Sequence, residues 1–152
     1  MPRFEVVTSI RAPRERCFDL ARDLDLHQAS MAASDERAIA GRTSGLIGLG
    51  EEVTWEARHF GVMHRHCSRI TAYVRPEYFQ NVMIQGRFKR FEHDHFFEEA
   101  RTGATTMRDV VVFESPLGPI GRIVDALVLS SYLERLIAQR NQVIKAAAER
   151  AS

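Results

Sequence analysis

The sequence has few cysteines, no long apolar run and almost no net charge, and each shortage excludes a class of protein. Its two cysteines, Cys17 and Cys67, are distant in sequence and do not form the dense framework of a disulfide-stabilised secreted domain. The N-terminal segment PRFEVV has neither the basic nor the apolar block of a signal peptide. We therefore expect a reduced, cytoplasmic protein.

Membrane and nucleic-acid partners are also not expected. No apolar run approaches the roughly 20 residues that a membrane-spanning helix needs, and the best one, IVDALVL, is interrupted by Asp125. The 21 Lys and Arg residues nearly balance 20 Asp and Glu, so the net charge of +1 provides no field that would attract a polyanion. The 152 residues fit one domain, residues 1–152.

The first third of the chain predicts a strand followed by two short helices. Apolar and polar residues alternate over residues 1–10, as in a strand with one buried face. After Pro13, residues 14–24 place apolar side chains three and four apart, which indicates a helix, and residues 24–31 continue as a second short helix. A strand at 36–41 and a glycine-rich connection follow.

A period of two begins at residue 51 and predicts a β-hairpin with a two-residue turn at 60–61. The resulting register sets Glu56 opposite Arg65 and Glu52 opposite Arg69, so that opposite charges pair on the outer face. The inner face then carries an aromatic residue and three histidines: Trp55, His59, His64 and His66.

Three further strands are predicted at 77–88, 91–100 and 105–115. In the segment FEHDHFFEEA the two histidines share the apolar face, whereas Asp94 between them points outward. If the next turn centres on Thr102, Asp109 points inward and lies directly opposite His95.

A long helix is predicted from Ile120 to about Ala148, because apolar residues recur there at helical spacing over some eight turns. Such a helix needs a sheet to cover. The sequence thus predicts an α+β fold in which a curved seven-stranded antiparallel sheet wraps around the long C-terminal helix, with two short helices after the first strand. Sheet and helix touch only along a narrow strip, which leaves space for a ligand cavity.

Three segments carry a resemblance to a known superfamily: TSIRAPRERCFDLARDLD at 8–25, GLIGLGEEVTWEARHFG at 45–61 and FESPLGPIGRIVDALV at 113–128. With the order of elements, they resemble the START-like (SRPBCC) superfamily, in particular its polyketide cyclase/dehydrase and lipid-transport type, which has the helix-grip fold. The resemblance implies a pocket for lipids, polyketides, quinones, sterols or plant-hormone-like molecules. It implies no common catalytic motif, because the superfamily uses one scaffold for many ligands.

We therefore expect the chain to bind a hydrophobic small molecule in an internal cavity, without a cofactor. The sequence leaves open whether the long helix also forms a homodimer. The residues predicted to line the cavity are Trp55, His59, His64, His66, Met83, Phe91, Phe97, Met107 and Leu127.

His93, His95 and Asp109 allow three interpretations. An inward histidine held by Asp109 can act as an acid or base in a cyclase, dehydratase or isomerase, so we assign the three residues to catalysis as the alternative to simple binding. Two histidines and a carboxylate can also hold a metal, but no cysteine or second carboxylate converges on the same face, and no metal is assigned. Neutral imidazoles are also ordinary polar members of a pocket wall.

Overall fold

The computed structural model describes residues 2–31 and 35–150, except for the side chains of residues 125 and 126. Its elements are β1 (Arg3–Ile10), α1 (Arg14–Ala21), α2 (Leu24–Ser30), β2 (Arg37–Gly41), β3 (Glu52–His59), β4 (Val62–Val74), β5 (Tyr78–Gln85), β6 (Arg90–Arg101), β7 (Ala104–Glu114), α3 (Gly118–Val124), the π-helical turn η2 (Asp125–Leu129) and α4 (Ser130–Arg150).

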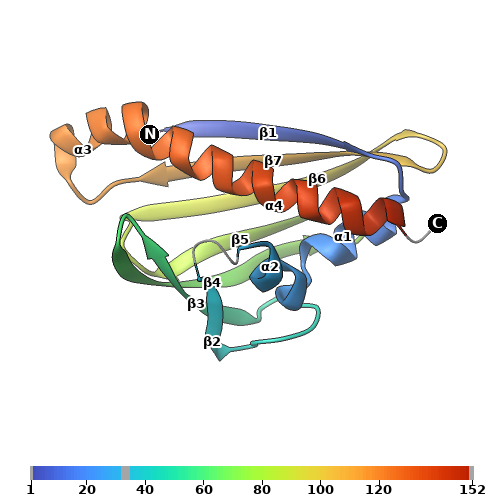
Figure 1. Cartoon of the computed structure of the whole chain (residues 1–152), viewed down its shortest axis with the longest axis horizontal. Helices are drawn as coiled ribbons and strands as arrows, with labels where there is room; N and C mark the ends of the chain where they lie inside the picture. The colour runs from blue at the N-terminus through green and yellow to red at the C-terminus, as the bar shows by residue number, and fades with distance from the viewer. Residues whose placement is uncertain (1, 32–34, 151–152) are drawn as a thin grey trace.

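The seven strands form one antiparallel sheet in the order β1-β7-β6-β5-β4-β3-β2. The sheet curves around α4, which runs along its inner face, and α1 and α2 lie at the end of the sheet nearer the C-terminus of α4 (Figure 1). The predicted fold class, with two short helices after the first strand, is confirmed.

Both predicted strand registers are present. Glu56 pairs with Arg65 and Glu52 with Arg69 across β3 and β4, and each pair forms an ion pair. Residues 60 and 61 both have positive φ, as a two-residue hairpin turn with right-handed strand twist requires. His95 lies opposite Asp109 across β6 and β7.

An aromatic cluster fills the core beneath α1. The buried ring of Phe18 contacts the rings of Tyr73, Phe79 and Phe97, with centroids 5.2–5.3 Å apart. Phe97 and Met107 are fully buried in this cluster. The prediction that these two side chains line the cavity is wrong, because they lie in the core with Phe18 and not among the side chains that line the cavity.

The predicted C-terminal helix is interrupted by the π-helical turn η2, and the segment before α4 extends past the sheet at the end far from the C-terminus (Figure 1). Ile120 and Leu127 are 73% and 72% exposed, so the prediction that Leu127 lines the cavity is also wrong. The apolar spacing identified a helix, but the sheet is too short to cover its first turns. Among the described residues, no helix is long and apolar enough to cross a membrane.

Candidate functional site

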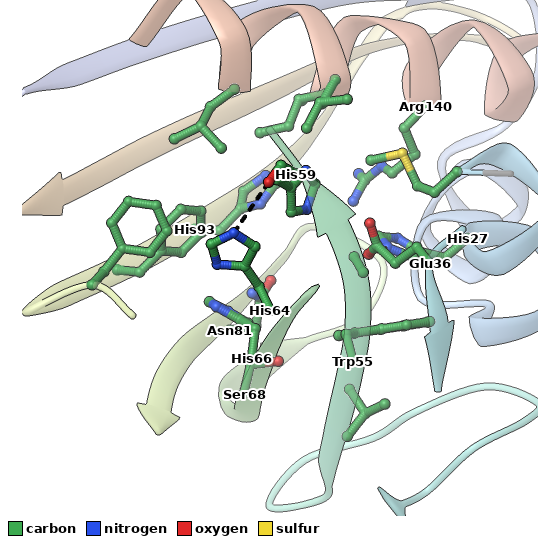
Figure 2. A pocket seen from close by; sticks show the side chains of 18 of the residues that line it. His27, Glu36, Trp55, His59, His64, His66, Ser68, Asn81, His93 and Arg140 are labelled. Atoms are coloured by element: carbon green, nitrogen blue, oxygen red, sulfur yellow. Dashed lines mark hydrogen bonds and ion pairs between the residues drawn. The ribbon is translucent and has the colours of Figure 1, made fainter. Parts of the chain in front are cut away.

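A cavity of about 460 Å³ lies between the inner face of the sheet and α4. Strands β3 to β6 form its floor, and α2 and α4 form its walls. Its apolar lining includes Trp55, Ile70, Phe79, Phe91, Leu133 and Ile137. All six histidines of the chain also line it: His27, His59, His64, His66, His93 and His95. Figure 2 labels five of these histidines, together with Trp55 of the apolar lining.

Most of the residues predicted for the cavity are found there. Trp55, His59, His64, His66 and Phe91 line it, as do His93 and His95. Met83 does not line the cavity. Its sulfur lies against Gly86 instead. Period two identified the inward face of each strand, and in these cases the inward face is also the cavity wall.

Asp109 is fully buried behind the cavity wall, where four side chains surround its carboxylate. Nε2 of His93 lies 2.7 Å and Nδ1 of His95 3.2 Å from Oδ1. From α4, Asn141 donates to Oδ2 at 2.7 Å, and Nη2 of Arg140 lies 3.4 Å from Oδ1. Burial alone would raise the pKa of Asp109, but these imidazoles and the Arg140 charge outweigh it and hold the pKa well below its usual range.

The two histidines on β6 differ in what their nitrogens can do. His95 stacks between Phe79 and His93, with ring centroids 4.1 and 3.8 Å away, and its Nε2 lies 2.7 Å from Oδ1 of Asn81. Its Nδ1 makes no hydrogen bond within the described part of the chain. Burial is the main cause of the lowered pKa of His95, and it lowers that of His93 as well, so both rings favour the neutral form.

His93 uses only one ring nitrogen. Its Nε2 faces Asp109, and Nδ1 has no hydrogen-bond partner in residues 2–31 and 35–150. A neutral imidazole that donates from Nε2 to the carboxylate keeps its lone pair on Nδ1. His93 therefore has the arrangement of an oriented base on the cavity wall.

His93, His95 and Asp109 are the group of described residues that could hold a metal ion, because one donor atom of each lies within 4.8 Å of the others. The side chains as they stand do not suit an ion. The two imidazoles are stacked nearly parallel, at an interplanar angle of 16°, so one ion cannot lie in the plane of both rings. The Arg140 guanidinium beside Oδ1 also places a positive charge next to the position. A hydrogen-bonded network describes these residues better.

A second polar group lies on the other side of the cavity. It includes His27 and Glu36, which the sequence analysis did not identify. Nε2 of His27 lies 2.7 Å from Oε1 of Glu36, and the His27 ring packs on Trp55 with centroids 4.4 Å apart (Figure 2). Burial would raise the pKa of Glu36, but nearby imidazoles, above all His27, lower it. Nδ1 of His59 lies 2.7 Å from the Tyr132 hydroxyl. This group offers a ligand several donors and acceptors.

Arg140 and Asn141 were also missed by the sequence analysis. Both are buried, and they lie on the face of α4 that carries Ile137 one turn before and Ile144 one turn after. A polar pair at the centre of an apolar helical stripe is the signal that could have revealed them, because such a pair needs a buried partner. That partner is Asp109.

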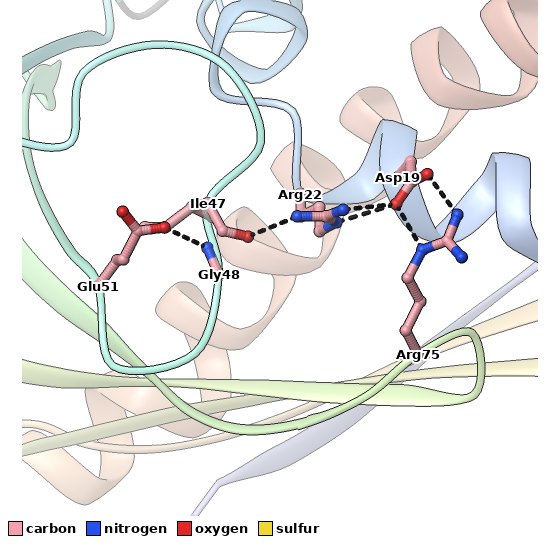
Figure 3. Close-up of polar contacts among 6 residues, drawn as sticks. All are labelled: Asp19, Arg22, Ile47, Gly48, Glu51 and Arg75. Carbon is pink, nitrogen blue, oxygen red and sulfur yellow. Dashed lines mark hydrogen bonds and ion pairs between the residues drawn. The ribbon is translucent and has the colours of Figure 1, made fainter.

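The glycine-rich loop before β3 is fixed against α1 by charged side chains, shown in Figure 3. Asp19 accepts hydrogen bonds from Arg22 and Arg75, and Nη1 of Arg22 donates to the carbonyl of Ile47 at 3.2 Å. The Arg75 guanidinium is the main cause of the lowered pKa of Asp19. These contacts hold the buried side chain of Ile47 in the cavity wall.

Known proteins resemble the chain in structure. No protein-family model matches the chain, and no curated protein matches it. Among solved structures, the protein TTHA0849 from Thermus thermophilus is 18% identical with a TM-score of 0.79, and 99% of each chain is covered. The major latex-like protein 151 from Panax ginseng is 14% identical with a TM-score of 0.72 over 97% of each chain.

A third structure, the Zhui aromatase/cyclase from Streptomyces sp. R1128, is 10% identical with a TM-score of 0.70, covering 99% of this chain and 98% of the other. At these identities the matches define the fold. The chain has the helix-grip fold, as the sequence resemblance implied.

Proposed function

We propose that the chain is a single ligand-binding domain whose cavity takes a hydrophobic small molecule bearing polar groups. The observation that carries the proposal is the cavity of about 460 Å³, with an apolar and aromatic wall on which all six histidines converge. Small-molecule sites have about this size and combine an apolar lining with a few placed polar groups. The major latex-like and aromatase/cyclase neighbours share the fold and support the proposal.

The test is a titration with phenylnaphthylamine, a neutral apolar dye that fluoresces when it leaves water. We expect saturable binding of one dye per chain. Ala57 is buried in the cavity wall, so Ala57→Phe should reduce the affinity at least about tenfold by filling the space. Arg58→Phe, which adds the same ring to the exposed face of β3, is the matched control and should leave binding unchanged. Equal dye binding by both variants would contradict the proposal.

A second candidate function is acid–base catalysis on the bound ligand, in a cyclase, dehydratase or isomerase. The observation that favours it is the buried contact between His93 and Asp109, with Nδ1 of His93 left as a base. Asp109 orients the ring, while His95 packs against it and holds it in place. In such a reaction Nδ1 removes a proton from the carbon next to a carbonyl, and the resulting enolate takes the proton back at another position.

Hydrogen–deuterium exchange tests this second function without knowledge of the natural substrate. A bicyclic aromatic ketone, β-tetralone, should exchange its acidic C–H protons in heavy water faster with the protein than with buffer alone. His93→Gln should lose this acceleration, whereas Asp94→Asn, on the outward face of the same strand, should keep it. If His93→Gln binds the ketone and exchanges it at the original rate, His93 is not the base.

A further inference from the structure

Arg140 is a buried cation whose hydrogen-bonding capacity is mostly unused. The exposed fraction of its side chain is as low as that of the core residues. The side chain extends from α4 to the cavity wall (Figure 2). Within the described ranges, Nη2 has a partner, Oδ1 of Asp109 at a long 3.4 Å, while Nε is buried without one. The hydrogen bonds of Arg140 within these ranges do not involve Nη1 either.

This arrangement is unusual because a guanidinium carries five N–H donors and stays charged at any physiological pH. Buried donors without a partner cost free energy, and native proteins leave few of them. Asp109 balances the charge of Arg140 but occupies little of its hydrogen-bonding capacity, since the carboxylate also has a closer contact with His93 and a hydrogen bond from Asn141. Because Arg140 lines the cavity and Nη1 has no hydrogen bond within the described ranges, that side of the guanidinium is available to a group inside the cavity.

We propose that Arg140 anchors an acidic oxygen group of the ligand, namely a carboxylate or an ionised phenol or enol. This inference rests on the proposed ligand-binding function and names the class of ligand. A planar guanidinium holds two oxygens of such a group with parallel, charge-assisted hydrogen bonds. The His93 ring lies next to the same position, because both side chains meet at Oδ1 of Asp109.

The other charges of the cavity limit the anchored group to a single negative charge. Glu36 lines the same cavity and stays ionised, because neighbouring imidazoles lower its pKa. The Asp109 carboxylate contacts the same guanidinium, with Oδ1 3.4 Å from Nη2. A dianionic phosphate would thus be repelled by the two carboxylates more strongly than a monoanion, which favours a group with a single charge.

The position of Arg140 also orients the ligand. Ile137 and Leu133 lie about one and two turns earlier on α4 and line the same cavity. The acidic group therefore binds at the Asp109 end, and the apolar body extends along these side chains toward Phe91 on the opposite wall.

The test compares naphthoic acid with naphthamide, which have nearly the same shape and differ in charge. Each displaces phenylnaphthylamine from the wild-type protein at neutral pH, and the acid should bind about tenfold more tightly than the amide, as expected for a hydrogen bond between charged groups. Equal or stronger binding of the amide would overturn the inference.

The variant test removes the anchor. Arg140→Gln alone leaves the buried Asp109 without its cation and can impair folding, so the double variant Arg140→Gln with Asp109→Asn is measured beside it. In either folded variant the preference for the acid should disappear while naphthamide still binds. Arg135→Gln, an exposed position on the same helix, removes the same net charge and should keep the preference. A preference that persists without Arg140 would overturn the inference.

The two levels of the proposal fail in different ways. If phenylnaphthylamine and naphthamide bind in the cavity but the acid has no advantage, the acidic anchor is wrong and the ligand-binding function stands. If neither the dye nor either naphthalene compound binds, the proposed function is wrong, and the inference about Arg140 is wrong with it.

Discussion

Nε2 of His93 lies 2.7 Å from Oδ1 of Asp109, and this carboxylate has no exposed surface. Through Asp109 the contact joins β6 to β7. Asn141 extends the network to α4, and Asn81 extends it to β5 through His95. One buried polar network thus connects three strands with the C-terminal helix, at the wall of the cavity.

Removal of the Asp109 carboxylate should strongly destabilise the fold. Asp109→Ala leaves Arg140 as an uncompensated buried cation, which should lower the free energy of unfolding by about 3–5 kcal/mol. Urea denaturation followed by circular dichroism measures the loss. Arg65→Ala removes an exposed side chain from its ion pair with Glu56 and should cost no more than about 1 kcal/mol. Similar losses for the two variants would mean that the buried network does not hold α4 to the sheet.

Acidification should destabilise the protein before its carboxylates titrate. Burial lowers the pKa of His66 from 6.5 to about 4 and also lowers those of His59 and His93. In the unfolded chain these imidazoles titrate near 6.5, so the unfolded state binds more protons between that pH and the lowered values. The stability is complete above pH 6.5 and decreases as the pH falls toward 4.

The measurement is urea denaturation at about pH 7 and about pH 5. The free energy of unfolding should be lower at the acidic pH, and His66→Gln should reduce the difference. A stability that is unchanged or higher at the lower pH would show that the imidazoles are not held neutral by burial.

Truncation of the aromatic core should also destabilise the protein. Phe18→Ala removes a fully buried ring that packs on Tyr73, Phe79 and Phe97, and it should cost about 3–5 kcal/mol. Val7→Ala, at an exposed position on β1, should change stability by less than about 0.5 kcal/mol. Thermal and urea unfolding of both variants check the contrast.

Removal of divalent metals should leave the protein unchanged. The stacked rings of His93 and His95 and the neighbouring Arg140 form a network that needs no ion. Dialysis against a chelator should therefore alter neither the Tm nor dye binding, since an ion bound to the folded state would have added stability. A lower Tm after chelation, restored by one metal per chain, would contradict the network and return His93, His95 and Asp109 to the role of ligands.

Sequence periodicity predicted the direction of side chains on the sheet well. Charge pairing fixed the hairpin register at Glu56 and Arg65, and the turn at 102 set Asp109 opposite His95. Such pairings are local, because a short turn determines the partner of each residue in the strands that it joins. The positions of His95 and Asp109 could therefore be predicted from the order of residues alone.

Two properties of a side chain could not be predicted in this way: how deeply it is buried, and which residues from distant parts of the sequence it contacts. Phe97 faces inward, as predicted, but it is covered by Phe18 of α1, and the strand pattern does not say which helix lies above it. Arg140 reaches Asp109 across 31 positions of sequence, and Glu36, next to β2, meets His27 of α2. Periodicity assigns a face, whereas the cavity depends on how distant elements pack.

The most direct test of the central claim is isotope-filtered NMR of the protein with bound phenylnaphthylamine. Nuclear Overhauser contacts should connect the ligand with the indole of Trp55, the single tryptophan of the chain, and with the methyl groups of Ile70 and Ile137. Contacts confined to the exposed side chains of Ile120 and Ile123 would instead place the ligand on the outside of α3 and contradict a cavity-binding protein.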